Sequence, residues 1–176
     1  MDTPRCAFCF GPLGLVREGA RFCSQRCGTY YRRRSLPREL TSRPRWVRHD
    51  ARKRPVDAHT GRLVDVTDPG AWVPYRVAKD STRGVGLGFV LSPEDDICCI
   101  DVGGALSDGL ITPRVRGLVA ATPDVFMVER SVSGVGIHIW HRGPSGPGTN
   151  RVEDGIRVER YSQGRYIAVT GLRLGL

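Results

Sequence analysis

The sequence contains no apolar run close to the roughly 20 residues that a helix needs to cross a lipid bilayer. Its first residues, MDTPRCAF, lack the basic and apolar regions of a signal peptide. It also contains no internal repeat and no low-complexity tract. These absences argue against a membrane protein, a secreted protein and a repeat array. We therefore expect a cytoplasmic protein without a membrane partner. Its 176 residues suffice for one medium domain, or for a domain with a small appendage.

Acidic residues are few, with 18 Asp and Glu against 27 Lys and Arg, and the formal net charge is +9. The shortage is greatest in residues 32–54, where Glu39 and Asp50 are the only acids. A basic segment of this kind often contacts the phosphates of nucleic acid, although a solvated linker is the alternative. We predict DNA contacts at its clustered basic residues: Arg32, Arg33, Arg34, Arg52, Lys53 and Arg54.

Four of the six cysteines lie in the first 27 residues, as Cys6-x-x-Cys9 and Cys23-x-x-x-Cys27. In a reducing cytoplasm such closely spaced pairs are more often metal sites than disulfides. Four thiolates satisfy the tetrahedral preference of zinc, and a module this small needs a cross-link such as a bound metal ion to fold. We therefore predict a structural zinc knuckle over residues 1–35. The other two cysteines, at positions 98 and 99, are expected to be buried in a sheet.

Prolines in Leu36-Pro37 and Arg43-Pro44 prevent a continuous helix through residues 36–44, which we interpret as a basic linker. A second module is expected over residues 45–176. Its apolar periodicity predicts helices from Asp68-Pro69 and over 113–121, and strands over 46–49, 84–91, 97–101, 125–130, 136–141, 156–161 and 166–170. The strands at 84–91 and 97–101 are expected to pair across a short turn. The resulting fold class is α+β, with a mostly antiparallel sheet and flanking helices.

Two carboxylates lie on strands expected in the second module. Asp101 ends the apolar strand 97–101, and Glu159 lies in the strand 156–161. A lone Asp at a strand end is more commonly a turn cap. If both side chains point to the same side of one sheet, however, their oxygens form a site for Mg²⁺ or Mn²⁺.

A third stretch, Ser-x-Ser-Gly-x-Gly-x-His, runs from Ser131 to His138. Its glycines, including Gly134, let backbone N–H groups approach an anion closely, and Ser131 and Ser133 add hydroxyl donors. His138 is then placed to donate to a phosphate oxygen. The alternative is a core histidine next to a hairpin turn.

Residues from about 43 to 173 resemble the bifunctional primase/polymerase (prim-pol) domain of phage and plasmid replication proteins. Five motifs occur in that family's order: TDPxxW from Thr67, GxGFV from Gly86, an apolar pair before Asp101, ExSxSGxGxH from Glu129, and VExYxxGRYxxVTG from Val158. The resemblance implies the fold of the archaeo-eukaryotic primase superfamily, with an RRM-like sheet. It also implies roles for site residues: Asp101 and Glu159 as metal-binding catalytic residues, His138 as catalytic and nucleotide-binding, and Ser131, Ser133 and Gly134 as nucleotide-binding. Arg165 is expected to be a further phosphate contact, because guanidinium matches phosphate geometry.

One position departs from the family pattern. The first family motif resembles Asp-x-Asp, whereas this chain has Asp101-Val102-Gly103. Glycine offers no metal ligand, and the loss of a carboxylate weakens a two-metal site. Three explanations remain open: a naturally degenerate enzyme, an engineered substitution, or a compensating acid such as Asp95 or Asp108.

The sequence therefore favours a DNA primase/polymerase module that makes or extends primers on a single-stranded DNA template by two-metal nucleotidyl transfer, impaired at Gly103. An inactive nucleic-acid or nucleotide-binding module of the same fold is the alternative. The expected partners are single-stranded DNA, nucleoside triphosphates and a replicative helicase, with Tyr30, Tyr31 or Trp46 as candidate base-stacking residues. We expect a monomer, in the host cytoplasm if the protein is phage-encoded, and either a fragment of a replication protein or a minimal stand-alone one.

Overall fold

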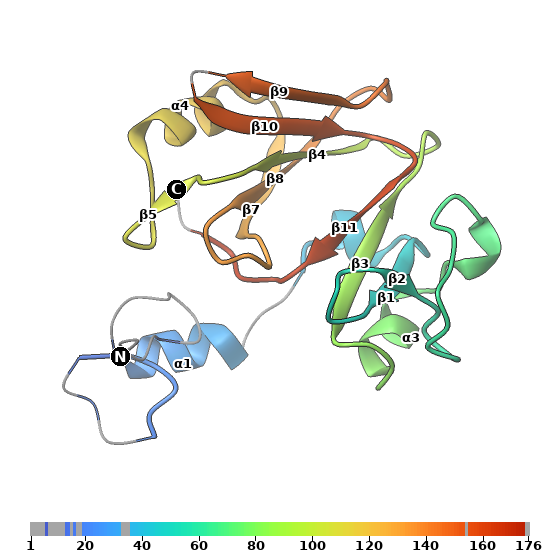
Figure 1. The fold of residues 1–176 in the computed structure, drawn as a ribbon, viewed down its shortest axis with the longest axis horizontal. Helices are drawn as coiled ribbons and strands as arrows, with labels where there is room; N and C mark the ends of the chain where they lie inside the picture. The colour runs from blue at the N-terminus through green and yellow to red at the C-terminus, as the bar shows by residue number, and fades with distance from the viewer. Residues whose placement is uncertain are drawn as a thin grey trace.

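The computed structural model describes residues 6, 13–14, 16, 19–32, 36–153 and 155–174. This part of the chain contains a five-stranded sheet, a four-stranded sheet and a two-stranded sheet of β5 and β6, with short helices around them (Figure 1). The helices are α1 Gln25–Arg32, α2 Arg38–Thr41, α3 Tyr75–Asp80 and α4 Pro113–Ala121, with a 3₁₀ turn at Pro69–Ala71. The strands are β1 Trp46–His49, β2 Pro55–Val56, β3 Gly86–Leu91, β4 Ile97–Val102, β5 Leu106–Ser107, β6 Leu110–Ile111, β7 Val125–Arg130, β8 Ile137–Arg142, β9 Thr149–Glu153, β10 Ile156–Tyr161 and β11 Arg165–Val169.

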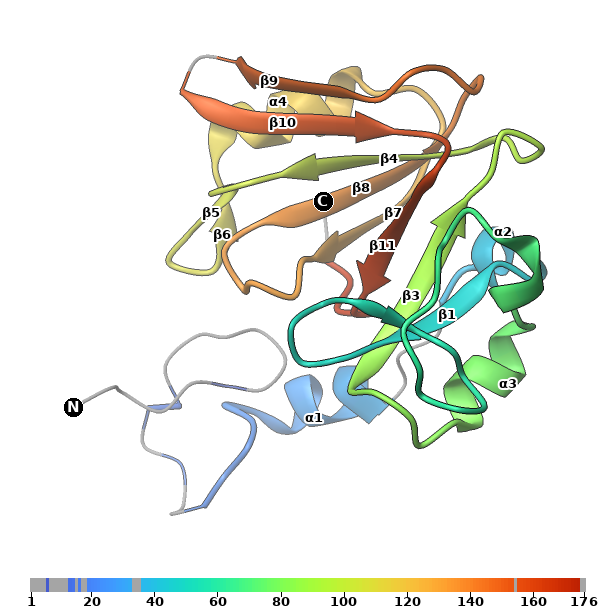
Figure 2. The same cartoon turned by 45° about the vertical axis from the view of Figure 1, so that its right-hand side comes forward.

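The larger sheet has five strands in the order β7-β8-β4-β10-β9. The smaller sheet has four, in the order β11-β3-β1-β2, and the two sheets lie at an angle to one another (Figure 2). All strand pairings among the described residues are antiparallel. The predicted α+β class with mostly antiparallel sheets is therefore confirmed.

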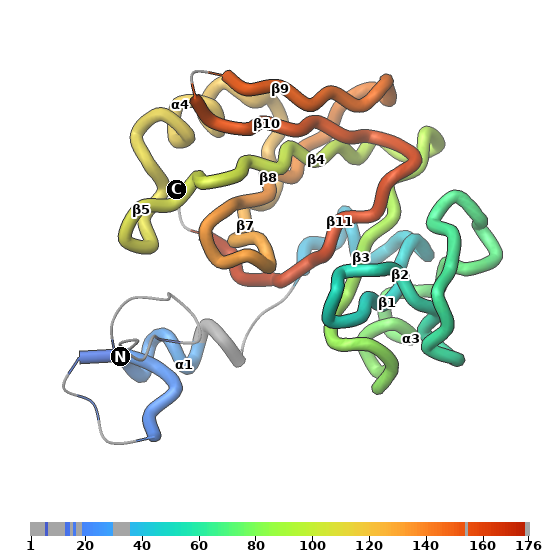
Figure 3. The backbone as a smooth tube through the Cα atoms, in the orientation of Figure 1, coloured from blue at the N-terminus to red at the C-terminus, as the bar shows by residue number. Residues whose placement is uncertain are grey.

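The predicted hairpin between residues 84–91 and 97–101 is wrong. β3 pairs with β1 and β11 in the smaller sheet, whereas β4 pairs with β8 and β10 in the larger one. The turn between them instead carries acids that hold it to other segments. Arg43 binds Asp95 at 3.0 Å and Asp96 at 2.7 Å, and Arg45 binds Asp95 at 2.9 Å. The chain thus crosses from one sheet to the other after β3, and it crosses back between β10 and β11 (Figure 3).

The two faces of the five-stranded sheet have different coverings. On one face, Val115 and Val119 of α4 pack in a cluster with Ile100, Val102 and Val158. On the other face, residues such as Cys99 and Trp140 join Trp46 and Phe89 of the smaller sheet in one core. Side chains alternate between the faces of a strand, so the face of β4 that buries Cys99 also carries Asp101. The core between the sheets therefore leads directly to the polar positions described below.

The helix predicted from Asp68-Pro69 is shorter and later than expected. Asp68 does act as an N-cap, accepting from the Gly70 amide at 2.8 Å, but only a 3₁₀ turn follows. The α-helix α3 begins at Tyr75, after Pro74. Extended backbone at Trp72, whose ψ is 140°, separates the two.

The segment expected as a linker contributes to the core at one point. A short helix that was not predicted, α2, lies between Pro37 and Pro44, and its Leu40 is completely buried. Its carbonyl accepts the indole N–H of Trp46 at 3.2 Å. Trp46 itself is fully buried, so it cannot stack on a nucleic-acid base, and that expectation is wrong. The side chains of Tyr30 and Tyr31 lie outside the described residues. No helix in the described part of the chain has the length and apolar character that crossing a membrane requires.

Candidate active site

Polar side chains form a row across the five-stranded sheet. The strand register pairs Glu129 with His138, His138 with Asp101, and Asp101 with Glu159. Residues directly opposite each other on neighbouring strands point to the same face of a sheet. The prediction that Asp101 and Glu159 share one face therefore agrees with the register. Residues two positions apart on a strand point to the same face, and Asp101 and Glu159 each lie two positions from a core residue or a groove residue on their own strand. Strand alternation therefore explains why both side chains point to this face.

Three members of this row line an open groove of about 590 Å³ between the two sheets: Asp101, His138 and Glu159. The five-stranded sheet forms one wall. The other wall comes from the four-stranded sheet and the turn before β2, and it includes Lys53, Arg165 and Tyr166. Tyr166 donates its hydroxyl to the Lys53 carbonyl, which ties the turn to β11. The groove is thus built by residues up to 115 positions apart in the chain.

The two facing carboxylates have unfavourable electrostatics without a cation. Burial raises the pKa of Asp101 above its ordinary value, and the negative charge of Glu159 adds to the rise. His138, Lys53 and Arg157 partly offset this effect. Carboxylate oxygens are the ligands that Mg²⁺ and Mn²⁺ prefer, and a divalent ion beside these two would favour the ionised form of both.

Glu159 is oriented by two neighbours on its own strand. Its Oε1 lies 2.5 Å from Nη2 of Arg157, and its Oε2 accepts from the Tyr161 hydroxyl at 2.8 Å. Burial, together with this hydrogen bond to Glu159, raises the pKa of Tyr161, so the phenol keeps its proton and remains a donor. The ring of Tyr161 in turn lies 4.8 Å from the guanidinium of Arg165. Arg165, predicted as a phosphate contact, therefore lies next to the tyrosine that orients Glu159, and it lines the same groove.

His138 is buried, and its two ring nitrogens have different surroundings. Nδ1 lies 3.1 Å from Oε1 of Glu129, while Nε2 lies 4.0 Å from Oδ1 of Asp101. The shorter contact makes Nδ1 the nitrogen that donates to Glu129, and Nε2 is left facing the groove. This is a partnered core histidine that also lines the groove, and its donation to a phosphate oxygen stays a prediction.

Glu129 is the residue whose importance the sequence did not reveal. It is completely buried, and the same Oε1 also accepts from the indole of Trp140 at 3.2 Å. Its Oε2 accepts from the Thr170 amide and hydroxyl, both at 3.0 Å, and from the Gly171 amide at 2.7 Å. It joins the strand that carries His138 to the segment that follows β11, so it links both sheets. Its place in the ExSxSGxGxH motif was the available signal, but a charged residue in a strand gave no hint of complete burial.

The Ser-Gly stretch forms the turn between β7 and β8 at one end of the groove. Ser131 and Ser133 line the groove, and their hydroxyl oxygens lie 2.9 Å apart. Gly134 has a φ of +80°, which favours glycine, but it does not line the groove. At Gly136 a side chain would meet the Val102 carbonyl oxygen at 2.8 Å, so glycine allows this turn to lie against β4.

Gly103 lines the groove two residues after Asp101, on the side where a second acid was expected. A Cβ built there would meet only Arg157, at 3.7 Å from its Cβ, which is ordinary contact. Neither proposed substitute acid lines the groove. Asp95 is held by Arg43 and Arg45, and Asp108 lies in the β5–β6 turn. Compensation by either acid is therefore wrong.

The predicted DNA-binding residues lie in different surroundings. Lys53 reaches the groove, Arg52 is exposed, and Arg54 forms a 2.8 Å ion pair with Asp50. Arg32 ends α1, but its side chain lies outside the described residues, as do Arg33 and Arg34 entirely. Sequence reasoning did not place Lys53 in the site, because its segment is distant from the motifs.

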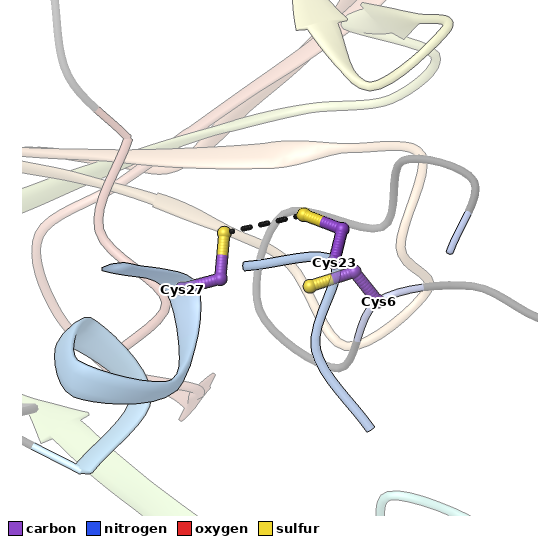
Figure 4. Close-up of side chains that lie close together, drawn as sticks. All are labelled: Cys6, Cys23 and Cys27. Atoms are coloured by element: carbon purple, nitrogen blue, oxygen red, sulfur yellow. Dashed lines mark hydrogen bonds between the residues drawn. The ribbon is translucent and has the colours of Figure 1, made fainter. Parts of the chain in front are cut away.

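Away from the groove, three cysteines gather at the start of α1 (Figure 4). The sulfurs of Cys6, Cys23 and Cys27 all lie within 4.8 Å of one another, and Cys23 and Cys27 are 3.6 Å apart. Zinc–sulfur distances of about 2.3 Å in a tetrahedron place the sulfurs about 3.8 Å apart, so this cluster fits a metal ion. None of the three forms a disulfide with another of them. The fourth predicted ligand, Cys9, lies outside the described residues.

The fold and the groove define an α+β protein with a candidate nucleotide and metal site between two antiparallel sheets. The chain is similar to the DNA primase-polymerase of Nitratiruptor phage NrS-1, with 28% identity over 134 residues. This distant similarity covers 72% of the present chain but only 18% of that phage protein. No family model matches the chain.

Proposed function

We propose that this chain is a primase/polymerase module that makes or extends primers on single-stranded DNA by metal-dependent nucleotidyl transfer. The observation that supports it most is the row of Asp101, Glu159 and His138 on one wall of an open groove. The distant similarity to a phage DNA primase-polymerase supports the same class of reaction.

In this proposal Asp101 and Glu159 hold Mg²⁺ or Mn²⁺. A divalent ion bound there would lower the pKa of an attacking 3′-hydroxyl and neutralise phosphate charge. When both of its ring nitrogens carry protons, His138 donates Nδ1–H to Glu129 and presents Nε2–H to a phosphate oxygen of the incoming nucleotide. Lys53 and Arg165 on the opposite wall contact phosphates of the substrate or template. The Ser131–Ser133 hydroxyls bind the same nucleotide at the end of the groove.

Incorporation of labelled nucleotide on primed and unprimed single-stranded templates, with Mn²⁺ or Mg²⁺, tests the proposal. We expect metal-dependent incorporation that Asp101→Asn removes and that Gly103→Asp increases, since the added carboxylate has room beside Arg157. The absence of incorporation by both the native chain and Gly103→Asp would contradict an enzymatic function.

The missing acid favours a second candidate function, a catalytically inactive module that binds nucleotide or single-stranded DNA. Binding of both ligands without incorporation, in every metal tested, would select this alternative. The two candidates share the groove and differ only in chemistry.

We also propose that Cys9 completes a four-cysteine zinc site with Cys6, Cys23 and Cys27. Elemental analysis of protein purified without chelators is expected to find one zinc per chain. Cys27→Ser should lower that content, whereas Cys98→Ser should not, because burial raises the pKa of Cys98 and favours its neutral thiol. We propose that this knuckle and residues 32–54 contact the phosphates of the template. We also propose that the chain binds a replicative helicase.

A further inference from the structure

The row of polar side chains across the five-stranded sheet has a closed end and an open end. At the β7 end, Glu129 is completely buried and His138 beside it is buried as well. At the other end, the register continues past Glu159 to Asn150 of β9, which is exposed and points to the same face. In the described part of the chain, β9 is the last strand on that side of the sheet. A polymer bound on this row would therefore run out into solvent across β9.

Two further side chains are exposed beside Asn150 on the same face. Val152 of β9 is 73% exposed and pairs with Arg157 of β10, whose side chain is 63% exposed. The guanidinium of Arg157 also lines the groove, with its Nη2 2.5 Å from Oε1 of Glu159. We call Asn150, Val152 and Arg157 the open-end surface. It offers an amide, an apolar side chain and a guanidinium, a combination that suits a sugar and its phosphate.

The geometry of nucleotidyl transfer indicates a ligand for this surface. When a nucleotide is added to a primer, the 3′-oxygen bonds to the α-phosphorus, the bond from that phosphorus to pyrophosphate breaks, and the hydroxyl proton leaves to water. The attacking and leaving oxygens lie roughly in line, on opposite sides of the phosphorus. In the proposed function, His138, Ser131 and Ser133 bind the triphosphate on the β8 side of the two carboxylates. The attacking 3′-oxygen then comes from the opposite side, which is the β9 side.

We infer that the open-end surface binds the 3′-terminal nucleotide of the growing strand, with Arg157 on its phosphate and Asn150 on its sugar. This inference rests on the proposed function and adds the place of the growing strand to it. The strand continues from there across β9 into solvent, so its length is not limited by the groove.

Binding of fluorescent DNA to the full chain, with Mn²⁺ but without nucleotide, tests the inference independently of catalysis. One probe is a template with a recessed primer 3′ end, and the other is the same template without the primer. Val152→Glu and Arg151→Gln form a matched pair of variants, because both positions are exposed on β9 and each change lowers the net charge by one. Arg151 pairs with the buried Val158, so it lies on the face that α4 covers.

Val152→Glu should weaken binding of the primed template about tenfold, because its carboxylate would repel the terminal phosphate. It should leave the affinities for the unprimed template and for a non-hydrolysable nucleoside triphosphate unchanged. Arg151→Gln should leave all three affinities unchanged, since solvent and salt screen a charge on the far face. Arg157→Ala should also weaken the primed template about tenfold, through the loss of one charged hydrogen bond. Ser133→Ala should show the reverse pattern, with weaker triphosphate binding and native binding of the primed template.

Three results for Val152→Glu would overturn the inference. Equal weakening of the primed and unprimed templates would place the template strand on this surface, and weaker triphosphate binding would place the incoming nucleotide there. Native affinity for the primed template would leave the surface without this ligand. A native chain that binds neither triphosphate nor DNA removes the proposed function itself, so the two failures are distinguishable.

Discussion

The five-stranded and four-stranded sheets present different side chains to the groove that they share. The larger sheet carries both carboxylates and His138, at neighbouring positions fixed by strand register. The smaller sheet contributes Lys53 and Arg165, one in a turn and one at the start of β11. Regular pairing thus positions the acids, whereas a turn and a strand end position Lys53 and Arg165. A metal site requires fixed ligand distances, while phosphate contacts tolerate longer, more mobile side chains. This division matches the roles proposed for the two walls.

Glu129 links the two walls, so its loss should have the largest effect. Glu129→Ala leaves the Trp140 indole, His138 and the Gly171 amide without their acceptor inside the protein. We expect the free energy of unfolding to fall by about 3–5 kcal/mol, because buried donors lose a charged partner. Urea denaturation measures this change. Glu94→Ala is the control, since Glu94 also forms a short ion pair but is 77% exposed. Equal effects in both variants would show that Glu129 has no special role in joining the sheets.

Removing charge from the acidic wall should abolish the reaction and preserve the fold. Glu159→Gln keeps the shape of the side chain but provides only a neutral ligand. We expect metal-dependent incorporation to fall at least a hundredfold, with an unchanged circular dichroism spectrum. Glu153→Gln changes a carboxylate on the adjacent strand that pairs with Arg160 and does not line the groove. If it reduced incorporation as strongly, the two walls would not have the separate roles proposed here.

On the basic wall, replacement of Lys53 and Arg165 by Ala should weaken binding of single-stranded DNA more at low salt than at high salt. Each lost phosphate contact reduces the slope of log affinity against log salt by about 0.7. The double variant should therefore lower the slope by about 1.4. The same measurement on Arg32, Arg33 and Arg34 replaced by Ala tests the predicted basic segment. An unchanged slope would identify that segment as a solvated linker.

The smallest expected effect concerns Asp101 and pH. Its pKa is raised in the folded protein by burial and by Glu159, so ionisation of this carboxyl opposes folding without a cation. This cost is absent below the ordinary Asp pKa of 3.8 and is fully present above the raised folded-state value. Asp101→Asn should therefore raise the thermal midpoint at neutral pH in metal-free buffer and leave it unchanged near pH 3.5. A lower midpoint at neutral pH would contradict the unfavourable pairing of the two acids.

The sequence predicted the acidic wall better than the basic one. Strand alternation and the spacing of Asp101, His138 and Glu159 are local properties, so their shared face could be inferred. The pairing of β3 with β11 depends on contacts between distant residues, and a short turn between β3 and β4 suggested the wrong partner. For the same reason Lys53 was missed in the groove. The burial of Glu129 and Trp46 depends on packing between sheets, which no periodicity reports.

The two crossings of the chain between the sheets have a consequence for biosynthesis. A nascent chain that has emerged as far as β9 contains Asp101 on β4 and His138 on β8. It still lacks Glu159 and the strand β11. The four-stranded sheet holds an open place beside β3 until residues 165–169 leave the ribosome. The groove therefore closes only once residues 156–169 have been synthesised. A chain that stops before β10 lacks Glu159 and leaves one edge of β3 unpaired, which makes it a ready substrate for proteolysis and chaperones.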